Sequence, residues 1–207
     1  MSLAEILRDF KTDVAQCDNL IANAHQTDSD GNFLFPLIAH QQITVSAFLN
    51  LYVAWETFLE SSLTELMVGS ATLSGSLPIR YISPLNVESA RMFVIGVHRY
   101  FDYGNHDYVR RMVRLYFKDG YPYEPHLGSI SSDLADLRTM RNASAHISST
   151  TQTALESLAM RVLSRPCSGI NLYTLLTAID PRSLVGDTVF LEYKNKLVVA
   201  AELIAQG

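Results

Sequence analysis

The sequence predicts an all-α protein, organised as a single-domain antiparallel helical bundle with long loops. Three observations predict this class. Hydrophobic residues recur at three- and four-residue intervals along most of the chain, turn-rich stretches separate these segments, and no pair of alternating segments brackets a tight turn as in a β-hairpin. With 207 residues, 48% of them hydrophobic, the chain is long enough for one sizeable core. We therefore expect one domain over residues 1–207.

The first half of the chain predicts four helices. A hydrophobic stripe over residues 2–25 predicts the first, and Pro36 can begin a second that runs to about Met67. A third helix is expected over about 86–102. After a break at Gly104 and Asn105, a fourth continues to Phe117.

The second half is expected to open with a loop over 118–129, where glycine and proline are frequent. A serine at 131 or 132 can then cap a helix that reaches about residue 147. Later helices are expected at about 151–164, 169–179 and 187–205.

Charge, cysteine content and hydropathy limit the classes of function. A net charge of −5 argues against an evenly cationic surface, although a local basic stripe remains compatible with it. Cys17 and Cys167 are too few for a disulfide framework. The N-terminus lacks the features of a signal peptide, and no apolar run approaches the roughly 20 residues of a membrane span. We expect a soluble cytoplasmic protein without a membrane partner.

A cluster of polar residues in the 133–147 helix carries the main functional hypothesis. At about 100° per residue, Leu134, Leu137, Met140, Ala145 and Ile147 define its apolar arc. Arg141 falls inside that arc, whereas Asn142 and His146 share the neighbouring face with Arg138. A guanidinium in an apolar arc must find an anion, a subunit interface or water.

The second helix supplies a candidate partner for this cluster. Its expected buried arc comprises Phe48, Leu49, Tyr52, Trp55, Phe58, Leu59, Leu63 and Leu66. Glu56 falls inside this arc, where a carboxylate is under pressure to pair. We expect Glu56 to contact Arg141 or His146 and to orient it; a structural ion pair without chemistry is an equally good interpretation.

The string Arg141-Asn142-Ala143-Ser144-Ala145-His146 has the form R-N-x-x-x-H and resembles the signature of the HEPN superfamily (higher eukaryotes and prokaryotes nucleotide-binding domains). The segment LYVAWETFLESSLTEL in the second helix also resembles that superfamily, so the resemblance covers about residues 40–165. It implies a metal-independent endoribonuclease, in which two copies of the motif form one composite site in a homodimer. His146 would be the general acid/base, Arg141 the cation that stabilises the phosphate, and Asn142 a positioning group.

The resemblance also concerns partners. It is compatible with a toxin or defence effector restrained by an antitoxin or other regulatory protein, and it implies no cofactor. In toxins regulated by a minimal nucleotidyltransferase, a tyrosine follows the histidine by two residues, and Ser148 stands at that place here. Some HEPN domains are catalytically silent nucleotide-binding or dimerisation modules, which is the alternative function.

Two further patterns complete the list of candidates. Arg110, Arg114 and Lys118 are spaced four apart in a segment without acids and, with Arg138, are the predicted RNA-binding residues; a solvated basic face is an equally good interpretation. His98, Asp102 and His106 are also spaced four apart, but the break at Gly104 and Asn105 argues against aligned ligands, so no metal site is expected.

Overall fold

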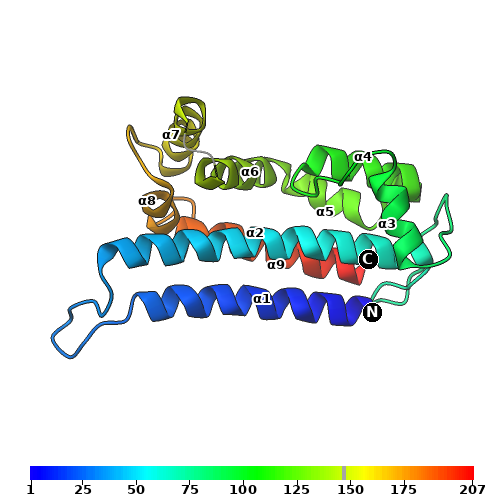
Figure 1. The fold of residues 1–207 in the computed structure, drawn as a ribbon, viewed down its shortest axis with the longest axis horizontal. Coiled ribbons are helices and arrows are strands. Elements are labelled where there is room, and N and C mark those ends of the chain that lie inside the picture. The colour runs from blue at the N-terminus through cyan, green and yellow to red at the C-terminus, as the bar shows by residue number, and fades with distance from the viewer. Residues whose placement is uncertain (146–147) are drawn as a thin grey trace. The chain divides into compact units, whose positions relative to one another are not determined.

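The computed structural model describes residues 1–145 and 148–207, and this part of the chain is all-α (Figure 1). It contains nine α-helices, one short 3₁₀ turn and no strand beyond isolated bridges. The helices are α1 Leu3–Ala24, α2 Leu37–Val68, α3 Val87–Ile95, α4 His106–Tyr116, α5 Tyr123–Ser129, α6 Ser131–Ala145, α7 Ser149–Leu163, α8 Leu172–Thr177 and α9 Val189–Gln206. The predicted all-α class is confirmed.

The described chain forms two compact units. Unit 1 comprises Met1–Lys11, Ala54–Leu134 and Leu197–Gly207. Unit 2 comprises Thr12–Val53 and Ala135–Lys196. Each unit therefore contains segments of α1, α2 and α9 together with helices of its own.

Unit 1 is built on aromatic side chains from α1 and α2. The ring centroids of Phe10 and Phe58 lie 5.3 Å apart, and those of Trp55 and Phe58 lie 5.8 Å apart. All three side chains are buried, and each contributes roughly 1.5–3 kcal/mol through burial. The short helices α3, α4 and α5 also belong to this unit, where the Tyr123 hydroxyl of α5 donates to Ser62 Oγ at 3.0 Å.

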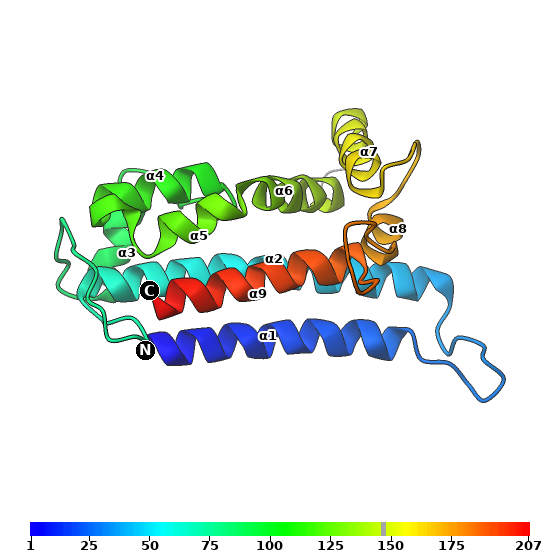
Figure 2. The same ribbon diagram turned by 180° about the vertical axis from the view of Figure 1, so that it is seen from behind.

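Unit 2 contains α6 from Ala135 onward, α7 and α8, together with the remaining segments of the long helices (Figure 2). Lys194 Nζ on α9 lies 2.8 Å from Asp18 Oδ2 on α1. The buried Asp136 of α6 accepts a hydrogen bond from the Tyr193 hydroxyl at 2.7 Å and pairs with Arg161 of α7. These contacts fix the rotation of α6, the helix that carries the motif.

Three sequence predictions about local structure are wrong. The helix expected over 86–102 ends at Ile95, because Gly96 adopts a positive φ of 60° as its C-cap. The segment 118–129, expected to be a loop, contains the turn Lys118–Gly120 and helix α5. Pro122 precedes α5 and Pro125 lies in its first turn, where a missing N–H costs no helical hydrogen bond.

The third wrong prediction concerns burial along α6. Leu134, Leu137 and Met140 are buried as expected, but Ala145 is exposed, and Ile147 lies outside the described residues. The apolar arc therefore ends before the last turn of α6. In the arc expected on α2, Leu49 is only half-buried, whereas its other members are buried.

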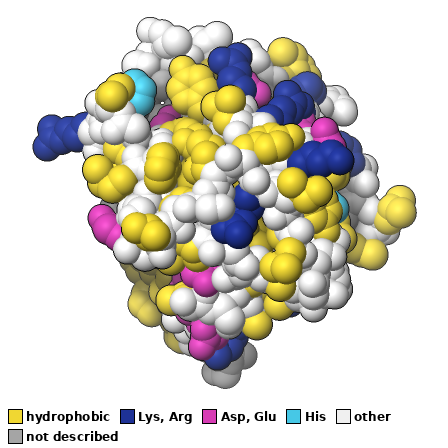
Figure 3. Space-filling model, turned by 90° about the vertical axis from the view of Figure 1, so that its right-hand side faces the viewer, with side chains coloured by type: hydrophobic (Ala, Val, Ile, Leu, Met, Phe, Trp, Pro, Cys, Tyr) yellow, Lys and Arg dark blue, Asp and Glu magenta, His cyan; other side chains and the backbone are white. Residues whose placement is uncertain are grey.

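Surface composition gives two general findings. None of the helices in the described ranges is both long enough and apolar enough to cross a membrane. Hydrophobic and basic side chains are interspersed over the face of the molecule shown in Figure 3.

Candidate functional site

The motif residues Arg141 and Asn142 lie near the C-terminal end of α6, in unit 2. Both side chains are half-buried, and Arg141 Nη1 donates to Asn142 Oδ1 at 3.3 Å. The Ser144 hydroxyl donates to the Arg141 carbonyl at 2.6 Å. No carboxylate within the described ranges pairs with Arg141. A partly desolvated guanidinium without an acid favours binding of an external anion.

The third motif residue, His146, lies outside the described residues. Two positions later, Ser148 is the N-cap of α7: its hydroxyl accepts from Thr151 N at 3.2 Å, in a capping box that Thr151 completes. A tyrosine hydroxyl is too far from its own backbone to cap in this way. Ser148 therefore has a structural role as the N-cap of α7.

The proposed orienting residue Glu56 belongs to unit 1 and is half-buried on α2. Arg141 belongs to unit 2. Their predicted contact stays a prediction, as does a contact of Glu56 with His146.

The residues expected to bind RNA have different environments. Arg110 and Arg114 on α4 both pair with Glu124 of α5, and Arg110 Nη2 lies 2.6 Å from Glu124 Oε1. Lys118 is exposed in the turn after α4, whereas Arg138 is exposed on α6 in unit 2. The structure thus brings Arg110 and Arg114 together around an acid.

The pairing at Glu124 changes the protonation equilibria of these groups. Burial acts to raise the pKa of the Glu124 carboxyl, but hydrogen bonds and charge from Arg110 and Arg114 outweigh it and lower the pKa below its ordinary value of 4.5. The hydrogen bond with Glu124 raises the pKa of Arg110. The Glu124 carboxylate partly neutralises the two arginines, and this reduces the attraction of this face for phosphate.

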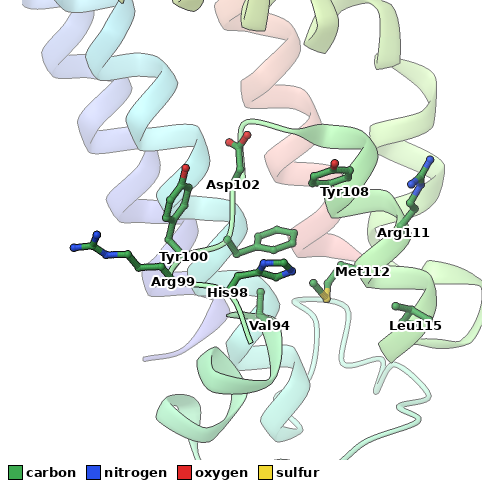
Figure 4. Close-up of a pocket in the computed structure, with 10 residues that line it drawn as sticks. Val94, His98, Arg99, Tyr100, Asp102, Tyr108, Arg111, Met112 and Leu115 are labelled. Atoms are coloured by element: carbon green, nitrogen blue, oxygen red, sulfur yellow. The ribbon is translucent and has the colours of Figure 1, made fainter. Parts of the chain in front are cut away.

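A cleft of about 550 Å³ lies beside the other face of α4, within unit 1 (Figure 4). Its lining comes from the end of α3, the connection that follows it, and α4. Tyr100 and Tyr108 are 73% and 52% exposed and border the cleft together with Arg99, Arg111 and His98. Its apolar members are Val94, Phe101, Met112 and Leu115.

Local contacts hold the walls of this cleft. Asn105 caps α4 by accepting from Tyr108 N at 3.4 Å, and the Tyr116 hydroxyl donates to the Phe93 carbonyl of α3 at 2.8 Å. The ring of Phe101 packs edge-on against the buried Tyr103, with centroids 4.8 Å apart. The lining is therefore fixed by backbone caps and core contacts.

The charges in the cleft are predominantly positive. Neither the Arg99 side chain nor the Arg111 side chain forms a hydrogen bond or ion pair with another residue in the described part of the chain. The one lining carboxylate, Asp102, accepts a hydrogen bond from Gly104 N at 3.1 Å and stabilises the turn before α4. Two guanidinium groups thus remain available to an external anion.

The histidines that suggested a metal site are separated by the fold. His98 lines the cleft, whereas His106 is buried and its Nε2 accepts from Trp55 Nε1 at 3.0 Å. Because an N–H donates to this nitrogen, its lone pair is already engaged. Across the residues described, no group of three or more histidine, cysteine or acidic side chains is arranged to hold a metal ion.

A second pocket, of about 540 Å³, lies in unit 2 and differs in charge. Its walls include Ile21, Leu176 and Phe190. Its one lining cation, Lys194, is paired with Asp18 at 2.8 Å. This pocket therefore lacks the unpaired cations of the cleft beside α4.

Sequence reasoning missed the cleft because its residues were assigned to other structures. The sequence predicts Arg99 and Tyr100 inside a helix, and Arg111 lies outside the face of Arg110, Arg114 and Lys118 to which RNA binding is assigned. The available signal was the glycine at position 96, a common helix terminator, followed by VHRYF with its cationic and aromatic residues.

Comparisons with protein-family models, curated proteins and solved structures give no match to this chain.

Proposed function

We propose that the protein is a metal-independent endoribonuclease that acts in the cytoplasm as a homodimer with a composite active site. The observation that carries the proposal is the half-buried Arg141, which has no carboxylate partner in the described chain and stands in an R-N-x-x-x-H motif. Such a guanidinium is suited to a phosphate group.

The proposed chemistry is an internal transesterification. His146 takes the proton of a ribose 2′-hydroxyl, whose oxygen attacks the adjacent phosphorus. Arg141 stabilises the negative charge that develops on the phosphorane oxygens, and Asn142 helps to hold the phosphate. The P–O5′ bond breaks, the leaving oxygen receives a proton, and the products carry a 2′,3′-cyclic phosphate and a 5′-hydroxyl.

The proton given to the leaving oxygen is the reason for proposing a dimer. One imidazole cannot be both deprotonated for the first transfer and protonated for the second at the same moment. Two copies of His146, one from each protomer, divide the base and acid roles. An antitoxin or other regulatory protein that covers this interface would restrain the activity of such a toxin or defence effector.

The test is incubation of the purified protein with mixed cellular RNA in excess chelator. His146→Ala and Arg141→Ala should each reduce cleavage by at least about 100-fold, because each removes a transition-state interaction. Arg165→Ala is the matched control, since Arg165 is exposed in the same unit and outside the motif. Cyclic phosphate ends from wild type and control alone support the proposal; undiminished cleavage in either motif variant contradicts it.

A second candidate is a catalytically silent nucleotide-binding or dimerisation module. The cleft beside α4 favours it, because Arg99, Arg111 and the tyrosines offer phosphate and base contacts without a catalytic arrangement. This candidate expects the wild-type protein to bind RNA or nucleotide at the cleft and to leave RNA intact, with His146→Ala indistinguishable from wild type.

A further inference from the structure

We propose that the cleft beside α4 binds a single strand of RNA, with bases against its aromatic and apolar lining and phosphates at Arg99 and Arg111. The identification of the strand as RNA rests on the proposed ribonuclease function. The lining of the cleft belongs to unit 1 and includes neither the motif residues Arg141 and Asn142 nor the basic residues that the sequence suggested.

The cleft carries positive charge that acidic side chains of the described chain do not neutralise. Arg99 and Arg111 lack acidic partners within the described ranges, whereas Arg110 and Arg114 share Glu124. The protein carries a net charge of −5, so a cleft with two unpaired guanidinium groups contrasts with the chain as a whole. Phosphate groups complement this local charge.

The cleft also exposes aromatic rings. Tyr100 and Tyr108 are 73% and 52% exposed, and Leu115 of the same lining is 67% exposed. Proteins that bind single-stranded nucleic acid combine aromatic faces with cations. Any base can stack on an aromatic ring, so this kind of binding tolerates different sequences.

The two cations of the cleft are placed apart. In Figure 4, Arg99 and Arg111 lie on opposite sides of the cleft, with His98 and Tyr108 between them. Successive phosphates of a strand can each meet one of two cations that lie on opposite sides of a cleft. The geometry therefore favours a polymer over a mononucleotide.

The experiment measures binding of a fluorescein-labelled single-stranded RNA decamer of mixed sequence by anisotropy. All proteins are full-length and carry His146→Ala, so that cleavage does not consume the probe. Arg99→Ala with Arg111→Ala should weaken binding at least 10-fold at low salt. The pair should also reduce the slope of log affinity against log salt by about 1.4, which corresponds to two lost phosphate contacts.

The matched control is Arg8→Ala with Arg165→Ala, which changes net charge equally at two exposed arginines outside the cleft. It should lose less affinity than the cleft pair at low salt, and it should stay within about twofold of the parent at about 0.15 M salt, where exposed charges farther than about 8 Å are largely screened. Equal losses in the two double variants would mean that binding follows net charge, and would overturn the proposal. Tyr108→Leu should weaken binding roughly 10-fold while leaving the salt slope unchanged, because it removes stacking alone.

Competition identifies the ligand. Unlabelled single-stranded RNA should displace the probe at far lower concentration than uridine monophosphate. Equal competition per molecule would assign the cleft to a free nucleotide and overturn the strand. Preferential displacement by duplex RNA would likewise overturn it, since stacking requires unpaired bases.

Failure of this inference is distinguishable from failure of the ribonuclease proposal. Cleft-dependent binding with no cleavage by the protein that retains His146 would support the cleft and contradict the enzyme. Cleavage and binding that are both unaffected by the Arg99 and Arg111 substitutions would support the enzyme and contradict the cleft.

Discussion

The two faces of α4 carry similar charges and have different environments. On one face, Arg110 and Arg114 converge on Glu124 of α5. On the other, Arg111 borders a cleft and has no acidic partner within the described chain. A basic periodicity therefore locates a face of a helix. Whether the charge of that face is available to a ligand depends on the acids packed against it.

The sharpest test of this contrast is the stability of two neighbouring variants. Arg110→Ala should reduce the free energy of unfolding by about 2 kcal/mol, because it removes charge-assisted hydrogen bonds and leaves the largely buried Glu124 with Arg114 alone. Arg111→Ala should change it by less than about 0.5 kcal/mol, since Arg111 is exposed and unpaired. Urea unfolding followed by circular dichroism measures both, and equal losses would contradict the contrast.

The pH dependence of the free energy of unfolding tests the pairing of Glu124 with Arg110 and Arg114 in a second way. Because arginine contacts lower the pKa of Glu124 below 4.5, its contribution is fully present above pH 4.5 and is lost as pH falls through the folded-state pKa. The stability difference between wild type and Glu124→Gln should therefore be largest at pH 7 and shrink below pH 4.5.

The control for this pH series is Glu88→Gln, which removes a carboxylate whose side chain is 76% exposed. Its difference from wild type should be small at every pH, because exposed ion pairs contribute little. A Glu124→Gln difference that grew on acidification would have the wrong sign for the assigned pairing.

The errors of sequence reasoning concentrate in the same region. The long helices and most of their buried arcs follow from periodicity, because burial of one face imposes a regular spacing. Glu124, however, lies in a segment expected to be a loop, so its pairing with Arg110 and Arg114 had no signal in the spacing. Arg99 lies beyond the early end of α3 at Ile95, which made the cleft equally invisible.

The candidate catalytic residues show another limit of the sequence. Periodicity predicted a partly enclosed Arg141, and the structure places its side chain half-buried. The composite site that we propose would need a second protomer, and the position of a partner depends on surface complementarity between chains, which leaves no regular spacing in one sequence.

Two buried threonines of α2 differ in whether their hydroxyl groups have a hydrogen-bond partner, and this difference should determine how each hydroxyl affects stability. Thr44 is buried and its hydroxyl has no hydrogen-bond partner in the described chain, whereas the buried Thr64 hydroxyl donates to the Glu60 carbonyl at 2.9 Å. Thr44→Val should raise the free energy of unfolding by about 0.5–1 kcal/mol, because it removes an unsatisfied group. Thr64→Val should lower it by a similar amount. Thermal and urea unfolding check the opposite signs.

A last variant tests whether the face of α4 that carries Arg110 and Arg114 can be converted into an RNA-binding face. Glu124→Gln leaves Arg114, whose side chain is 55% exposed, without its carboxylate and free to meet a phosphate. Affinity for the RNA decamer should rise about threefold at low salt, and the salt slope should steepen by up to about 0.7, the value for one added contact. Glu88→Gln makes the same change in net charge and should leave both quantities nearly unchanged. If the two variants gain equally, the total charge of the protein governs RNA binding, and local pairing at α4 does not.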